Sequence, residues 1–239
     1  MEPGSAAEGE AADCLQLFGP AQGYVFVVTY GRSGSTVLQA VLNTIPGWCI
    51  RGENAGALTH LCRAVEGLRE NPARAQGREV PDDPWFGFAG IKIDAVARAL
   101  FEVFCREILR LPPGTRVGGF KEIRYVEDAA FLPTQLALME EFFPKARFVF
   151  LTRNHSEVAR SGWWGQWPAE EVAADLAAAD AAFAEFGKGR ANCFTLDHAD
   201  LIPDSDRLQA LFDFLGESYS PSRVGAVLHR RLSHGVLSG

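Results

Sequence analysis

The sequence predicts an α/β protein in which a central, mainly parallel sheet is flanked by helices. Short apolar segments rich in β-branched and aromatic residues alternate along the chain with longer segments of helical spacing. Such alternation is typical of parallel strands joined by helical crossovers. The chain is 239 residues long and 47% hydrophobic, with no internal repeat. This length and composition favour one sizeable core and one domain.

The first strand is predicted over 24–30, where every residue is β-branched or aromatic. A loop of glycine, serine and threonine follows, and helical spacing begins at 37–42. Pro46 and Gly47 end this helical segment. The next predicted elements are a short strand over 48–50 and a helix over 54–69.

A long loop is predicted over 71–90, because this stretch is rich in proline, glycine and charge. Loops of this length are usually lids, binding loops or disordered segments, and we expect this one to cover an acceptor site. The remaining elements are a helix over 94–110, a strand over 115–120, a helix over 132–143, a strand over 146–152 followed directly by a helix, an alanine-rich helix over 169–186, a strand over 193–196, and helices over 205–215 and 222–232.

Charge and cysteine content exclude several classes of protein. A net charge of −7 argues against a general nucleic-acid binder, whose affinity comes from clustered lysine and arginine. The cysteines form no C-x-x-C pair, which disfavours zinc and fits a reducing, cytoplasmic compartment. Residues 1–22 lack the features of a signal peptide and are expected to be a disordered leader, so the domain spans 23–239. No apolar stretch approaches the ~20 residues of a membrane span.

The loop after the first strand is expected to cradle an anion. Gly31 and Gly34 permit backbone conformations that other residues avoid. Backbone N–H groups of the loop and helix N-terminus would converge on a phosphate or sulfate, with hydroxyl donors from Ser35 or Thr36. The loop is not a Walker A motif, because the only cation, Arg32, precedes the second glycine. The Rossmann glycine spacing is absent too.

Charged residues follow several predicted strands. In open α/β sheets, ligands bind beyond the carboxyl ends of the strands, so one cleft is expected to hold these residues together. They are Arg32, Glu53, Lys121 and Arg153.

Two strand-to-helix junctions resemble those of the sulfotransferase family. One is the loop Gly31-Arg32-Ser33-Gly34-Ser35-Thr36, and the other is the segment 148–164, in which Ser161 lies eight residues after Arg153. The resemblance implies a P-loop-like three-layer sandwich that uses 3′-phosphoadenosine 5′-phosphosulfate (PAPS) and releases 3′-phosphoadenosine 5′-phosphate (PAP), without a metal. It places the 5′-phosphosulfate on the loop and the 3′-phosphate on Arg153 and Ser161. Two turns of helix bring positions eight apart near one face, and a guanidinium forks two donors onto one phosphate.

The resemblance also implies catalytic roles. Arg32 would neutralise the leaving group, and Lys121 is the next cation that could reach the sulfuryl group, although a salt bridge with Glu122 is the alternative. Glu53 resembles the base of bacterial trehalose-type sulfotransferases, although a carboxylate near a helix N-terminus is also stabilised by the helix dipole. His155 is a reserve candidate for the base, as is Glu122.

The loop form G-R-S-G-S-T is more similar to carbohydrate and bacterial sulfotransferases. The expected acceptor is therefore a hydroxyl of a carbohydrate or glycosylated small molecule. Aromatic residues that could stack against it are Trp85, Phe86, Trp163, Trp164 and Trp167.

Two other function classes remain open. One is a P-loop-like nucleotide kinase or NTPase, for which Asp197 is the comparable magnesium ligand. The other is a non-catalytic nucleotide-binding module. The predicted partner is a small molecule or glycan, with no nucleic acid and no membrane span, and a homodimer is an open alternative to a monomer.

Overall fold

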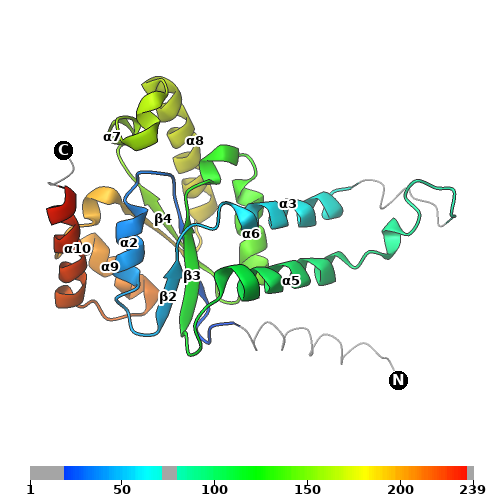
Figure 1. The fold of residues 1–239 in the computed structure, drawn as a ribbon, viewed down its shortest axis with the longest axis horizontal. Helices are drawn as coiled ribbons and strands as arrows, with labels where there is room; N and C mark the ends of the chain where they lie inside the picture. Colours follow the sequence, from blue (N-terminus) through cyan, green and yellow to red (C-terminus); the bar gives the residue numbers. More distant parts are fainter. Residues whose placement is uncertain (1–18, 72–79, 236–239) are drawn as a thin grey trace.

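A computed structural model describes residues 19–71 and 80–235 (Figure 1). Its centre is a five-stranded sheet of order β2-β3-β1-β4-β5, and every neighbouring pair of strands is parallel. This confirms the predicted fold class. The predicted leader lies outside the described residues up to position 18. The strands are β1 Tyr24–Val28, β2 Trp48–Arg51, β3 Val117–Glu122, β4 Arg147–Thr152 and β5 Cys193–Asp197.

Helices cover both faces of the sheet. Successive side chains of a strand point to opposite faces, and in β1 Val25 and Val27 pack with α2, α9 and α10, whereas Phe26 packs with α3, α5, α6 and α8. All five residues of β1 are buried, as expected for a central strand covered on both sides. The helices are α2 Ser35–Leu42, α3 Ala57–Arg69, α5 Ile93–Val103, α6 Leu132–Phe142, α7 His155–Ala159, α8 Ala169–Gly187, α9 Asp206–Leu215 and α10 Pro221–Gly235.

Some boundaries differ from those predicted. β1 ends at Val28, and β3 continues to Glu122, so Lys121 lies within a strand and pairs in register with Val27 of β1. The predicted helix over 94–110 is α5 followed by a π-helix, Phe104–Leu109. Local periodicity cannot locate these limits, because pairing with β1 extends β3 and a change in hydrogen-bond pattern ends α5.

The predicted long loop joins α3 to α5. Residues 72–79 of it lie outside the described part, and residues 80–90 extend beyond the end of α5 away from the sheet (Figure 1). Trp85 and Phe86 are 43% and 53% exposed. Its role as a lid stays a prediction. Within 19–71 and 80–235, no helix combines the length and apolar character needed to cross a membrane.

Candidate functional site

A cavity of about 310 Å³ lies beyond the carboxyl ends of β1, β3 and β4. We call it the loop cavity, because the glycine loop after β1 forms much of its wall. It contains most of the residues that the sequence singled out. These are Gly31, Arg32, Gly34, Ser35, Thr36, Glu53, Lys121 and Arg153.

The glycine loop presents backbone donors to this cavity. Gly34 is the N-cap of α2, with a left-handed φ of 90° and no side-chain cap. The first N–H groups of a helix have no intrahelical acceptor, and they attract anions. Gly31 is required for another reason, because a Cβ there would lie 2.3 Å from Cζ2 of Trp163. Arg32 also has a positive φ, 68°, which is uncommon for a residue with a Cβ.

Ser33 supports the loop from inside. Its side chain is buried, and its Oγ is hydrogen-bonded to Oγ1 of Thr29 at 2.8 Å. The Thr29 hydroxyl donates to the carbonyl of Leu151 at 2.6 Å, which fastens the loop to β4. Ser33 does not line the loop cavity, and its buried hydroxyl contacts Thr29, so the observed role of this side chain is structural.

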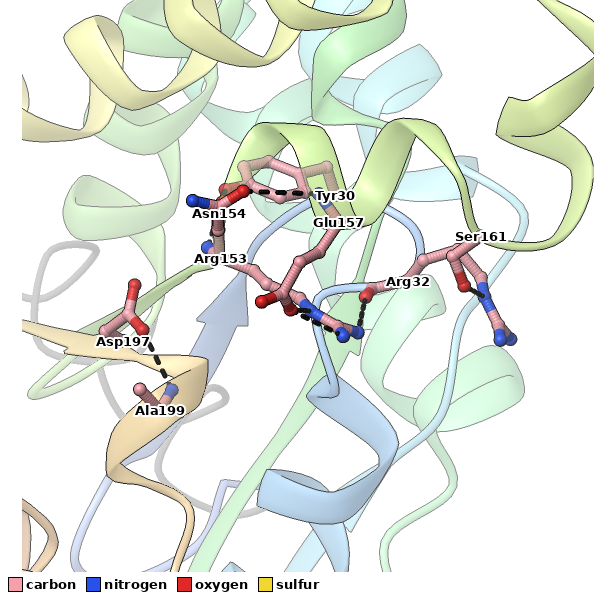
Figure 2. A network of polar contacts seen from close by, with 8 residues as sticks. All are labelled: Tyr30, Arg32, Arg153, Asn154, Glu157, Ser161, Asp197 and Ala199. Atoms are coloured by element: carbon pink, nitrogen blue, oxygen red, sulfur yellow. Dashed lines mark hydrogen bonds and ion pairs between the residues drawn. The ribbon is translucent and has the colours of Figure 1, made fainter. Parts of the chain in front are cut away.

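Arg153 is held by contacts on three sides (Figure 2). Its Nε and Nη2 donate to Oε2 of Glu157 at 3.0 and 2.9 Å, and its Nη1 donates to the carbonyl of Arg32 at 2.9 Å. The Tyr30 hydroxyl accepts the backbone N–H of Arg153 at 2.8 Å and donates to its carbonyl at 3.1 Å. Three of the five guanidinium N–H groups are therefore engaged, and the remaining two are available to a ligand.

Arg32 connects the two sequence motifs. Its Nε donates to Oγ of Ser161 at 2.9 Å, while its carbonyl accepts from Arg153. Figure 2 shows that Arg153 and Ser161 contact opposite ends of Arg32. Ser161 does not itself line the loop cavity. The structure nevertheless links Arg153 and Ser161, which were predicted to bind the 3′-phosphate, through Arg32, which was predicted to neutralise the leaving group.

Lys121 forms an ion pair with Glu53, and its side chain is only 8% exposed. The alternative partner from sequence, Glu122, makes different contacts. One oxygen of Glu122 accepts the backbone N–H groups of Asn54 and Gly56 at 3.1 and 3.0 Å. The other accepts the backbone N–H of Ile123 at 2.8 Å. Glu122 is thus a structural anchor that fixes the segment carrying Glu53.

His155 lies apart from the loop cavity. Its Nε2 is hydrogen-bonded to Oδ2 of Asp180 at 2.7 Å, which joins α7 to α8. Burial raises the pKa of Asp180, and the hydrogen bond with His155 partly offsets this effect. The structure therefore does not bring His155 together with Glu53 and Lys121, and its observed contacts are structural.

Three residues of the site were missed in the sequence. Glu157 carries a detectable signal, since an acid four residues after Arg153 on a helix can pair with it. His198 follows a predicted strand, so the rule of carboxyl ends applied to it as well, whereas Tyr30 lay inside the first strand as predicted and follows β1 only in the structure. A Cβ on Gly34 would lie 2.4 Å from Cδ2 of His198. Burial, and then the charge of Arg153, lower the pKa of His198.

Two further cavities meet the loop cavity at Glu53. The tryptophan cavity, about 340 Å³, is lined by Glu53, Trp163, Trp164 and the ion-paired Arg124 and Glu127. Trp164 is fixed because its Nε1 donates to the carbonyl of Gly31 at 3.1 Å.

The arginine cavity, about 460 Å³, lies on the side of β2 and the π-helix. It is lined by Arg51, Glu53, Phe104, Ile108, Arg110 and Phe120, among others. Trp85, Phe86 and Trp167 line none of these three cavities.

Asp197 is already engaged. Its Oδ1 accepts the backbone N–H of Ala199 at 2.8 Å (Figure 2). Its Oδ2 accepts the Thr152 hydroxyl at 3.2 Å. In the described ranges, no group of three or more histidine, cysteine, aspartate or glutamate side chains is arranged to hold a metal ion.

A sequence model of the sulfotransferase family matches residues 24–221. The chain belongs to the sulfotransferase family. This confirms the recognition from the two junctions and makes the protein a PAPS-dependent sulfotransferase by class. No curated protein matches the sequence.

A solved structure supports the fold. The sulfotransferase domain from the curacin biosynthetic pathway superposes with a TM-score of 0.51 at 16% identity, covering 85% of this chain and 77% of that domain. Mouse sulfotransferase SULT7A1 complexed with PAP gives a TM-score of 0.49 at 14% identity, with coverage of 92% and 68%. Sulfotransferase STF1 from Mycobacterium tuberculosis gives 0.47 at 14% identity, with coverage of 93% and 73%.

Proposed function

We propose that this sulfotransferase moves a sulfuryl group from PAPS to a hydroxyl of a carbohydrate or glycosylated small molecule. The observation that supports this most directly is the composition of the loop cavity. It combines unpaired helix N-terminal donors, two cations from the motifs, and a carboxylate paired with a third cation.

Residues suited to bind each end of PAPS are available. Gly31, Ser35 and Thr36 would hold the 5′-phosphosulfate through the open N-terminus of α2. Arg153 would take the 3′-phosphate with its two remaining N–H groups, and Ser161 would contribute its hydroxyl. The buried Ser33 would hold the loop in shape.

Sulfuryl transfer resembles phosphoryl transfer, so catalysis consists mostly of positioning and electrostatic stabilisation. When bound, PAPS supplies the activated sulfuryl group. Arg32 and Lys121 would stabilise the negative charge that develops around it. Glu53 would accept the proton of the acceptor hydroxyl, and its ion pair with Lys121 holds the carboxylate at the point where the three cavities meet.

The tryptophan cavity is suited to a sugar ring. Trp163 is 47% exposed and presents an aromatic surface beside Glu53. The apolar face of a sugar can lie on such a surface while the Arg124–Glu127 pair offers polar contacts. A kinase receives no comparable support, because Asp197 is engaged and the residue directly after Gly34 is a serine and not the lysine of a Walker A loop.

The test is sulfuryl transfer from PAPS to a panel of sugars and alkyl glycosides, measured for the wild type and Glu53→Gln. We expect Glu53→Gln to lower kcat by about 10²- to 10⁴-fold, because a general base typically contributes that much. Its affinity for PAP should stay within about twofold, since Gln keeps the size of the side chain. Glu185→Gln, an exposed position on α8, is the matched control and should not change kcat.

The possible results distinguish between loss of the proposed base, a non-catalytic binding module and failure of the proposed function. Transfer that survives in Glu53→Gln at the wild-type rate would remove Glu53 as the base and leave the enzyme class intact. PAP binding by the wild type without transfer to any acceptor would favour the non-catalytic module. Absence of both binding and transfer would contradict the proposed function.

A further inference from the structure

The arginine cavity is larger than the loop cavity and the tryptophan cavity, which it meets at Glu53, and its volume of about 460 Å³ falls in the range of small-molecule sites. Part of its lining is apolar, with Phe104 and Phe120, both almost fully buried, and Ile108 among the lining residues. Ile108 at its edge is 46% exposed, a large fraction for an isoleucine. A ligand in this cavity therefore gains by placing an apolar portion against the exposed surface of Ile108.

The charged residues of this cavity lie at two places. Glu53 forms the boundary with the loop cavity, where Lys121 compensates its charge. Arg51 and Arg110 supply positive charge at the π-helix. In the part of the chain that the structure describes, the guanidinium of Arg110 has no carboxylate partner, and the residue is exposed. The cavity thus carries uncompensated positive charge beside the exposed apolar side chain of Ile108.

The backbone around Arg110 is unusual and is held in place. Residues 104–109 form a π-helix, a form that occurs frequently at functional sites. Arg110 follows it with a left-handed φ of 45°, which is uncommon for a residue with a Cβ. Arg51 donates from Nε to the carbonyl of Leu109 at 3.1 Å and from Nη2 to the carbonyl of Arg110 at 2.5 Å. These bonds fix the position from which the Arg110 side chain departs.

From this arrangement we infer that the acceptor is an amphiphilic anion: a glycoside whose apolar substituent ends in an acidic group. The inference rests on the proposed function and specifies its acceptor. The sugar lies against Trp163, and the reacting hydroxyl lies at Glu53. The apolar substituent lies against Ile108, and a carboxylate or similar anion pairs with Arg110. An uncharged glycoside would fill the same cavities and leave Arg110 unpaired.

The experiment compares two probes that differ in charge and by a single methyl group, carboxyoctyl β-D-glucoside and its methyl ester. Their binding is measured calorimetrically to PAP-saturated protein, so that the result does not depend on turnover. We expect the acid to bind the wild type about threefold to fivefold more tightly than the ester, the range of a partly exposed ion pair. Arg110→Gln should bring the ratio to about one, and Arg110→Lys should keep most of it.

Arg98→Gln is the matched control, because Arg98 is an exposed arginine on α5 that does not line the arginine cavity, and it should leave the ratio unchanged. Equal binding of acid and ester, binding of neither, or a preference that persists in Arg110→Gln would overturn the inference. Failure of PAP to stabilise the wild type would instead contradict the proposed function, so the two failures are distinguishable.

Discussion

The Tyr30 hydroxyl is expected to contribute more to the free energy of unfolding than one hydrogen bond would. It accepts the backbone N–H of Arg153 and donates to the carbonyl of the same residue. Tyr30→Phe keeps the ring that stacks on Phe183 at 6.4 Å between centroids and removes the hydroxyl that makes these two bonds. Each net hydrogen bond contributes about 1 kcal/mol, and a buried group left without a partner costs more. We therefore expect the free energy of unfolding to fall by about 2–3 kcal/mol, or roughly 4–12 °C in Tm.

The assay is urea unfolding followed by tryptophan fluorescence, with Tyr24→Phe as the matched control. Tyr24 is equally buried, but its hydroxyl contacts only Sγ of Cys105 at 3.6 Å. Its loss should cost less than about 1 kcal/mol. Tyr30→Phe should also weaken binding of PAP more than binding of ADP, because Arg153 is displaced. Equal destabilisation by the two variants would refute the reasoning.

Two further perturbations test the electrostatics of the same region. Arg153→Ala should weaken PAP binding by about 10- to 100-fold and leave ADP binding within about twofold, because charge-assisted bonds to the 3′-phosphate are lost. Both affinities are measured by titration calorimetry, and equal losses for PAP and ADP would show that Arg153 is structural. The pKa of His198 is lowered from 6.5 by burial and then by Arg153. The stability it contributes is therefore complete above pH 6.5 and is lost as the pH falls through the lowered pKa. His198→Gln should flatten the decrease in Tm between about pH 7 and pH 5, and an unchanged slope would contradict this assignment.

The sequence was most informative where function depends on chain order. The glycine loop, Arg153 and the carboxyl-end rule together predicted a cavity that contains Arg32, Glu53 and Lys121. These predictions needed only the alternation of strands and helices, because parallel strands place their carboxyl ends on one edge.

The directions of side chains could not be predicted in this way. Ser33 looked like any other hydroxyl of the loop, but contact with Thr29 turns it into the core. The pairing of His155 with Asp180 joins positions 25 residues apart on different helices. Lys121 had Glu122 as its neighbour in sequence, yet successive residues of a strand point to opposite sides, and the partner that the fold brings to it is Glu53.

The most direct test of the nucleotide assignment is the thermal stabilisation of the purified protein by PAP, compared with ADP and with ATP and Mg²⁺ at equal concentration. A ligand that binds only the folded state raises Tm, and at a hundredfold excess over Kd the rise should be roughly 5–10 °C. We predict a rise with PAP that exceeds those with ADP and with ATP and Mg²⁺. A larger rise with ATP and Mg²⁺, or no rise with PAP, would contradict the assignment of the loop cavity.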